Sequence, residues 1–168
     1  MIVALLCVLL CVLAFLILLE RNDKSSVGVE IQLLSDYTKV PKYKTEGAAC
    51  ADIYANLHKS IVLEPHCVAK IPTGFKLNIP NGFEVLLRPR SGLSLNGIAL
   101  ANCIGTIDSD YNKEVIVLLS NHSNEPFTIE NGMRVAQMGI KKVQFLDFKV
   151  VEKLTEITER GGFGSTGL

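Results

Sequence analysis

The chain has 168 residues with 17 basic and 17 acidic side chains, so its formal net charge is zero. This length suits one domain, and the balanced charge gives no long-range attraction to nucleic acid, so we expect no nucleic-acid partner. The 5 cysteines are odd in number and no pair has CxxC spacing, which favours reduced thiols over a disulfide framework or a zinc site.

Residues 2–19 form an unbroken apolar run without charge, proline or glycine. About 18 helical residues just reach across a hydrocarbon core. Neither a basic start nor a small-x-small cleavage site is visible, so an uncleaved anchor is favoured over a secretory signal, and a segment unrelated to the fold is a third interpretation. We expect a transmembrane helix within 1–19, a polar linker over 20–28, and a cytoplasmic domain tethered by its basic flank at Arg21 and Lys24.

From residue 29 to 158 short apolar runs alternate with turn residues. Phe75, Leu77 and Ile79 share one face of a strand-like run, and Asn-Gly pairs mark hairpin turns. No stretch after residue 19 has the period of a long amphipathic helix, so we predict an all-β sandwich, barrel or jelly roll. The expected strands are Val29–Leu34, Ile61–Leu63, Val68–Ile71, Phe75–Ile79, Phe83–Arg88, Ile98–Ala101, Glu114–Leu119, Phe127–Ile129, Met133–Ile140 and Phe148–Leu154.

Three polar positions in this domain indicate a binding site. The run Arg88-Pro89-Arg90-Ser91-Gly92 combines a guanidinium, a hydroxyl and a bare backbone, which suits a phosphate. The segment Gly105–Tyr111 adds the carboxylate of Asp108 and an aromatic face, although either stretch alone is also an ordinary surface turn. Asp52, within the small-residue segment Ala48–Ala55, is either a strand-end cap or a carboxylate that holds water around magnesium.

Residues 159–168 are rich in glycine and contain a G-x-G-x-x-G pattern. A dinucleotide site is disfavoured because no helix of a βαβ unit follows the pattern. Backbone N–H groups beside the hydroxyls of Ser165 and Thr166 can cradle phosphate oxygens, and Phe163 can stack on a base. We therefore predict a C-terminal lid that folds over a ligand, with a plain flexible tail as the alternative.

Five segments, in order, resemble the motifs of the homotrimeric dUTPases (deoxyuridine triphosphate nucleotidohydrolases). The resemblance covers roughly Val29 to Leu168. It implies a jelly-roll-like distorted β-barrel of the dUTPase-like β-clip type, with the N-terminal hydrophobic helix outside the fold. It also implies a homotrimer whose sites are shared between subunits, and Mg²⁺-dependent hydrolysis of dUTP to dUMP and pyrophosphate. That reaction limits uracil incorporation into DNA and supplies dUMP for dTMP synthesis. The similar segments are Ala48–Ala55, Arg88–Ser94, Asn102–Val115, Asn131–Gln137 and Arg160–Gly167.

The resemblance also implies roles for individual residues. Asp108 would act as general base on the water that attacks the α-phosphorus, and Tyr111 would pack under the deoxyribose. Asp52 would hold magnesium through water. Asn102 and the Thr106–Asp108 backbone would read uracil, and Phe163 would cover it. The substrate contacts implied beside Tyr111 are Arg90, Ser91, Gly92, Asn102, Thr106, Ile107, Gln137, Arg160, Phe163, Gly164, Ser165 and Thr166.

Two positions depart from the family pattern: Lys113 stands where the third motif has glycine, and Arg160 is two residues closer to Phe163 than in the fifth motif. Two alternatives share the fold. A dCTP deaminase would lack the Gly-rich tail and the Ile107–Tyr111 hairpin, both of which are present. A catalytically silent dUTPase-fold protein that binds partners at a membrane would have no need to keep Asp108 and the tail, and a purely structural β domain ranks below both.

Overall fold

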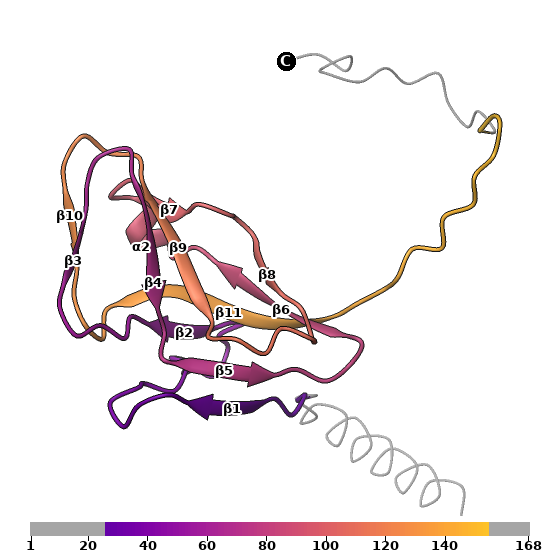
Figure 1. Ribbon diagram of the computed structural model, residues 1–168, viewed down its shortest axis with the longest axis horizontal. Coiled ribbons are helices and arrows are strands. Elements are labelled where there is room, and N and C mark those ends of the chain that lie inside the picture. Colours follow the sequence, from indigo (N-terminus) through magenta and orange to yellow (C-terminus); the bar gives the residue numbers. More distant parts are fainter. Residues whose placement is uncertain (1–25, 155–168) are drawn as a thin grey trace, which may run out of the picture.

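The computed structural model describes residues 26–154 (Figure 1), and within them the chain forms eleven β-strands and one short helix. The all-β prediction is therefore confirmed. The predicted anchor (1–19) and lid (159–168) lie outside the described residues, so these domain boundaries stay predictions. Within residues 26–154 no helix is long and apolar enough to cross a membrane. The elements are β1 (Glu30–Leu33), β2 (Ala51–Tyr54), β3 (Ile61–Leu63), β4 (Val68–Pro72), β5 (Phe75–Asn78), β6 (Phe83–Arg88), α2 (Ser91–Ser94), β7 (Ile98–Leu100), β8 (Gly105–Ile107), β9 (Ile116–Asn121), β10 (Phe127–Ile129) and β11 (Arg134–Lys142).

All strand pairs are antiparallel. A four-stranded sheet has the order β2–β11–β6–β8, and a three-stranded sheet has the order β4–β9–β7. Two ribbons, β1–β5 and β3–β10, complete the described fold. Figure 1 shows β11 crossing the molecule, where it pairs with β2 on one side and β6 on the other. Because β11 lies between β2 and β6, its register determines which of their side chains lie side by side on each face of the sheet.

The core lies between the sheets and follows from the alternation of apolar residues. Phe75 and Leu77 of β5 point inward, as predicted, and so do Val85 and Leu87 of β6. Burying each such side chain stabilises the fold by roughly 1.5–3 kcal/mol. The buried hydroxyl of Thr73 donates to the carbonyl of Val115 at 2.6 Å, so the core contains this polar group without an unpaired donor.

The predicted strand Phe148–Leu154 is wrong. Residues 143–154 form no regular element and run away from the sheets in Figure 1. Phe145 and Phe148 are 87% and 83% exposed. Alternating apolar residues form a strand only beside a partner strand, and the described chain offers none here. Conversely, β2 and α2 were not predicted as elements, and β8 was expected only as part of the hairpin around Gly105–Tyr111. Strand β9 begins and ends two residues later than the predicted Glu114–Leu119.

Two glycines flank the β5 region with the same left-handed backbone, which permits a matched comparison. Gly74 has φ +76° and Gly82 has φ +81°. Alanine in this conformation costs about 1–2 kcal/mol at either site. A Cβ at Gly74 would also overlap the Asn56 amide and the Thr38 hydroxyl, whereas a Cβ at Gly82 meets nothing within 4 Å.

We therefore expect Gly74→Ala to lower the free energy of unfolding by roughly 1–3 kcal/mol more than Gly82→Ala does. Urea titration of both variants measures this difference. Equal losses would show that the packing of Thr38 and Asn56 against Gly74 contributes no stability beyond the backbone conformation.

Candidate functional site

The buried carboxylate of Asp52 collects three donors from separate parts of the chain. Its side chain is only 3% exposed and lies inside β2, so the strand-end cap interpretation is wrong. Arg90 Nε lies 3.3 Å from Oδ1, and Gln137 Nε2 also donates to Oδ1 at 3.3 Å. Arg134 Nη1 donates to Oδ2 at 3.0 Å. Asp52 thus joins two of the predicted phosphate contacts, Arg90 and Gln137, with Arg134, which was not among the predicted contacts.

A β-bulge explains how Arg134 reaches the carboxylate. Residues three apart on a regular strand point to opposite faces. The register between β11 and β2 shifts between Arg134 and Ala136, so Arg134 pairs with Tyr54 while Gln137 pairs with Asp52. Because Tyr54 and Asp52 are two apart and share a face, the bulge turns Arg134 and Gln137 to the same side. Arg134 lies within the segment that resembles the fourth motif. Alternation along a regular strand, however, predicts that its side chain points to the face opposite Gln137.

Arg90 is held at both ends of its guanidinium. Its Nε donates to Asp52, and its Nη1 donates to the backbone carbonyl of Arg134 at 3.3 Å. A guanidinium has five N–H donors, so three remain for a ligand. Arg90 immediately precedes α2, whose first N–H groups, at Ser91 and Gly92, have no partner within the helix. A Cβ at Gly92 would meet nothing within 4 Å, which leaves this backbone open to close approach.

The surroundings of Asp52 are positively charged. Lys42 pairs with Asp52, Asp52 pairs with Gln137, and Gln137 pairs with Arg88. Directly paired residues share a face, so these four side chains form a row across the sheet. Burial alone raises the pKa of Asp52, but hydrogen bonds from Arg134 and Gln137 and the charges of Arg90 and Arg134 outweigh it. They hold the pKa below its ordinary value of 3.8. The carboxylate is therefore ionised near neutral pH, and the cluster with two guanidiniums keeps a net positive charge suited to an anion.

The second predicted stretch lies on β8 and the turn after it. Ile107 points into the core, so it offers only its backbone, whereas the side chain of Thr106 is exposed. The side-chain amide of Asn102 lies over Gly105, where a Cβ would come within 3.3 Å of Nδ2. Within the described residues, β8 pairs only with β6, so its other edge keeps free backbone donors and acceptors.

Asp108 and Tyr111 form a closed turn despite Lys113. The Tyr111 N–H donates to the Asp108 carbonyl at 3.1 Å, and the Tyr111 hydroxyl donates to the Glu114 carbonyl at 3.0 Å. Tyr111 also lines a cavity of about 440 Å³ between this turn and the β1–β5 ribbon. The carboxylate of Asp108 is exposed. The turn therefore presents an acid and an aromatic ring to solvent at one corner of the molecule.

One chain does not bring Asp108 to the Asp52 cluster. Leu86 pairs with both Thr106 and Gly139, and continuing this register sets Asp108 beside Glu84, four residues from Arg88. With strands about 4.8 Å apart and a rise of about 3.4 Å per residue, Asp108 and Gln137 are separated by roughly 15 Å or more. A general base must lie within hydrogen-bond reach of its water, so this separation of the two backbones disfavours joint action of Asp108 and Gln137 of one chain on one phosphate.

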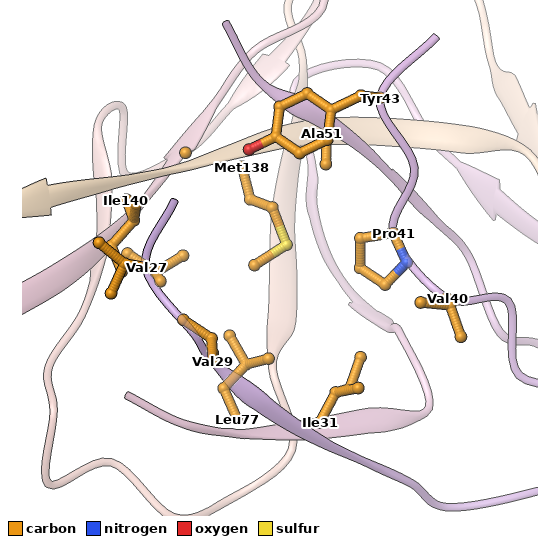
Figure 2. A pocket seen from close by; sticks show the side chains of 12 residues that line it. Val27, Val29, Ile31, Val40, Pro41, Tyr43, Ala51, Leu77, Met138 and Ile140 are labelled. Carbon is orange, nitrogen blue, oxygen red and sulfur yellow. The ribbon is translucent and has the colours of Figure 1, made fainter. Parts of the chain in front are cut away.

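An apolar cavity of about 250 Å³ lies on the opposite face of the same sheet (Figure 2). Met138 pairs with Ala51 and Leu87, so these side chains point away from Asp52 and Gln137. Figure 2 shows Val29, just before β1, and Ile31 of β1 facing Met138 across the cavity. This lining is nearly all hydrocarbon, with no cation for a phosphate, and it does not suit a nucleotide. The wall consists of Val27, Val29, Ile31, Val40, Pro41, Tyr43, Ala51, Leu77, Val85, Met138, Gly139 and Ile140.

Comparison with known proteins gives one consistent result. Residues 36–167 match the family model of dUTPase. The chain belongs to the dUTPase family. Over 132 residues it is 46% identical to the deoxyuridine 5'-triphosphate nucleotidohydrolase of Fusobacterium nucleatum, a match that covers 77% of this chain and 90% of that relative.

Solved structures agree with this family assignment. A mutant dUTPase of Staphylococcus bacteriophage 80alpha with dUpNHpp has a TM-score of 0.73 and 27% identity, covering 85% of this chain and 100% of that one. A mutant dUTPase of phage phi11 of S. aureus, described with a structural Mg(II) ion, has a TM-score of 0.67 and 24% identity, covering 76% of this chain and 98% of that one. The latter likeness supports the fold alone.

The described residues of this dUTPase-family chain hold no group of three or more His, Cys, Asp or Glu side chains that could bind a metal ion. Asp52 accepts two donors at Oδ1 and one at Oδ2. A carboxylate has about four acceptor positions, so Oδ2 retains one for a water molecule. Mg²⁺ keeps several waters and uses few carboxylates when phosphates supply the other oxygens. The donor set therefore fits a magnesium ion held by water and substrate, and does not form a cage by itself.

The lowered pKa of Asp52 gives the stability of this dUTPase-family domain a defined pH dependence. Because the folded pKa is below the unfolded value, the stabilisation is complete above the unfolded value and is lost as pH falls through the folded value. We expect the free-energy difference of unfolding between wild type and Asp52→Asn to shrink as pH falls below 3.8. Chemical denaturation at a series of pH values measures it.

The control is Asp36→Asn, which removes an exposed carboxylate outside this network. Its free-energy difference from wild type should stay small throughout. A difference for Asp52→Asn that grows on acidification would contradict the assignment of its pKa shift.

Proposed function

We propose that the chain hydrolyses dUTP to dUMP and pyrophosphate. The main support for this proposal is the Asp52 cluster. In it a single carboxylate holds Arg90 and Gln137 on one open face that is net positive and lies beside free backbone N–H groups. Membership of the dUTPase family supports this substrate, since the relative in Fusobacterium nucleatum carries the name deoxyuridine 5'-triphosphate nucleotidohydrolase. The reaction would keep uracil out of DNA and supply dUMP for dTMP synthesis.

The phosphates are bound by the cluster and by α2. Arg90 offers three remaining N–H donors, and a charge-assisted hydrogen bond to a phosphate oxygen is stronger than a neutral one. The N–H groups of Ser91 and Gly92 and the Ser91 hydroxyl lie next to it in sequence. Gln137 has one amide proton left after its bond to Asp52. These groups stabilise the charge that develops on phosphate oxygens, which is the main task in phosphoryl transfer.

Uracil is read by the open edge of β8 and by Asn102. The unpaired backbone N–H and C=O groups around Thr106 and Ile107 can match the carbonyl and N–H groups of a pyrimidine edge. A base with a different donor pattern would leave these groups without partners, which makes the discrimination strong. Tyr111 packs against the sugar, in keeping with its place in the lining of a cavity.

Asp108 accepts the proton of the attacking water. Its exposed carboxylate follows the buried Ile107 and is oriented by a turn that the Tyr111 N–H closes. A positioned general base contributes about a hundredfold to ten-thousandfold in rate. Magnesium, when bound through water at Asp52 and through the phosphates, would neutralise charge on the leaving pyrophosphate.

The active form is a homotrimer with shared sites. The separation of roughly 15 Å or more between Asp108 and Gln137 in one chain supports a site built from more than one copy. The exposed Phe145 and Phe148, on a segment that runs away from its own sheets, also support association. Each copy would contribute its Asp108 turn to one site and its Asp52 cluster to another.

Residues outside the described part of the chain complete the proposed site. Phe163 would cover the uracil, and Arg160, Gly164, Ser165 and Thr166 would close over the phosphates as a lid. The anchor within residues 2–19 and a cytoplasmic location likewise stay predictions from the sequence.

Asp108→Asn should lower the turnover of dUTP at least about a hundredfold while leaving dUTP binding nearly unchanged, because the amide cannot accept the proton. Pyrophosphate release in the presence of Mg²⁺ measures turnover. The matched control is Asp110→Asn, two residues away in the same exposed loop, which should stay within about threefold of wild type. Near-full turnover of Asp108→Asn would show that another group is the base, and a wild-type chain that releases no pyrophosphate would refute the proposed function.

The shared site predicts complementation between two inactive variants. Asp108→Asn and Arg90→Gln should each be inactive as pure trimers. Equal co-refolding should restore about a quarter of wild-type activity, because that fraction of sites combines an intact Asp108 with an intact Arg90 from a neighbour. Light scattering should give three times 18.4 kDa.

The control for complementation is the Asp108→Asn/Arg90→Gln double variant refolded with each parent, which should restore nothing. Failure of the two parents to complement, with trimers formed, would mean that Asp108 and Arg90 of one chain serve the same site.

A further inference from the structure

Glu114 makes two hydrogen bonds that connect the proposed site to the framework of the domain. Its Oε1 accepts from the backbone N–H of Gly74 at 2.7 Å, and its backbone carbonyl accepts from the Tyr111 hydroxyl at 3.0 Å. The residue is half-buried, between the exposed Lys113 and the buried Val115. Glu114 therefore joins the aromatic ring of the proposed sugar contact to a turn that lies 40 residues earlier in the chain.

Gly74 is a firm point of attachment for this carboxylate. Its carbonyl accepts from the Leu34 N–H at 2.8 Å and from the Thr38 hydroxyl at 3.1 Å. Its φ of +76° and its close contact with Asn56 leave no space for a side chain. A carboxylate that accepts from a backbone N–H makes a charge-assisted hydrogen bond, which is roughly twice as strong as a neutral one. Glu114 is thus fixed to a backbone that is itself held by several bonds.

The loop 108–115 depends on this attachment because it forms no helix or strand of its own. Two further bonds hold its far end: Val115 N–H donates to the Phe75 carbonyl at 2.9 Å, and the Thr73 hydroxyl donates to the Val115 carbonyl at 2.6 Å. Neither bond uses the Glu114 side chain. Removing that side chain should therefore loosen the part of the loop that holds the ring and leave the entry to β9 in place.

Packing alone does not fix the Tyr111 ring. The residue is 37% exposed, and it borders the cavity of about 440 Å³ beside the β1–β5 ribbon. A side chain with open space on one side keeps rotamer freedom unless a hydrogen bond restricts it. The bond from its hydroxyl to the Glu114 carbonyl supplies such a restriction.

The position of the ring decides which sugar the proposed site accepts. A ring packed against deoxyribose excludes an added 2′-hydroxyl only while it cannot move away. Steric rejection of one small extra group is worth roughly 10–200-fold in kcat/KM. A displacement of about 1 Å changes rates by a similar factor, so a mobile ring loses most of this selectivity.

We propose that Glu114 is a positioning residue that sets the selectivity of the site for deoxyribose over ribose. Its carboxylate fixes residue 114 to Gly74, its carbonyl holds the Tyr111 hydroxyl, and the ring then excludes the 2′-hydroxyl. This inference rests on the proposed function. It adds a determinant of selectivity that lies outside the proposed phosphate and uracil contacts and acts through Tyr111.

The test compares kcat/KM for dUTP and for UTP in the full chain with Mg²⁺, measured as pyrophosphate release. Glu114→Ala should lower the dUTP-to-UTP ratio at least about fivefold, because the ring loses its support. Glu114→Gln keeps a side-chain oxygen that can accept from the Gly74 N–H, so its ratio should stay closer to that of wild type. A merely structural role would lower both kcat/KM values together and leave their ratio unchanged.

Tyr111→Phe tests the second bond, because it keeps the ring and removes the hydroxyl. It should also lower the dUTP-to-UTP ratio. If Glu114 acts through Tyr111, the loss of ratio in Glu114→Ala/Tyr111→Phe should be smaller than the product of the two single losses. Independent, multiplicative losses would overturn the coupling between the two residues.

Lys113→Ala is the matched control in the same loop. Its side chain is exposed, and among the described non-glycine residues only His66 has a positive φ, so alanine fits at position 113 without strain. Its ratio should equal that of wild type.

An unchanged ratio in a folded Glu114→Ala would overturn the inference, and so would a ratio in Glu114→Gln as low as in Glu114→Ala. Should Glu114→Ala fail to fold, Tyr111→Phe decides, since an unchanged ratio there excludes positioning through the hydroxyl. The proposed function fails separately, if wild type does not hydrolyse dUTP.

Discussion

The ionised carboxylate of Asp52, buried to 3% exposure, is the constraint on which the polar face of the sheet depends. A buried charge is costly unless it is paired and hydrogen-bonded, and here Arg90, Arg134 and Gln137 satisfy it. The three donors come from the loop after β6 and from β11, so the carboxylate fixes these segments relative to β2. One interaction therefore both stabilises the sheet and holds partly exposed guanidiniums in place.

The second constraint is the incomplete edge structure of a single chain. β8 has an unpaired outer edge within the described residues, and the segment after β11 carries exposed Phe145 and Phe148. Free backbone groups and exposed aromatic side chains both favour contact with another molecule. The free edge of β8 suits a ligand with complementary donors and acceptors. The exposed Phe145 and Phe148 suit contact with a further copy of the chain.

The apolar cavity on the opposite face shows how one sheet separates two environments. Alternation along β2 and β11 sends Asp52 and Gln137 to the polar face, and Ala51 and Met138 to the cavity in Figure 2. A shift of one residue in this register would exchange the two sets of side chains. The bulge changes the side-chain direction of Arg134, while Gln137 and Met138 keep the faces that their pairing with Asp52 and Ala51 gives them. Its position at the start of the strand leaves the rest of β11 regular.

The sequence by itself determined the fold class, the family resemblance and most of the strands. Strands such as β3, β5, β6 and β10 follow directly from local alternation and turn residues, which need no knowledge of distant partners. The ordered motifs indicated Arg90, Gln137 and Asp52 as parts of one site, and the structure brings these three together. These features were predictable because each depends on short segments of the chain.

Only the tertiary structure decided the position of Arg134, the distance between Asp108 and the Asp52 cluster, and the absence of a strand at 148–154. The first depends on a register shift between β11 and β2, which are about 80 residues apart along the chain. The second depends on the strand order β2–β11–β6–β8, and the third on whether a partner strand is present. Pairing between distant segments leaves no local pattern, because a strand has the same alternation whether its partner comes from its own chain, from another copy, or is lacking.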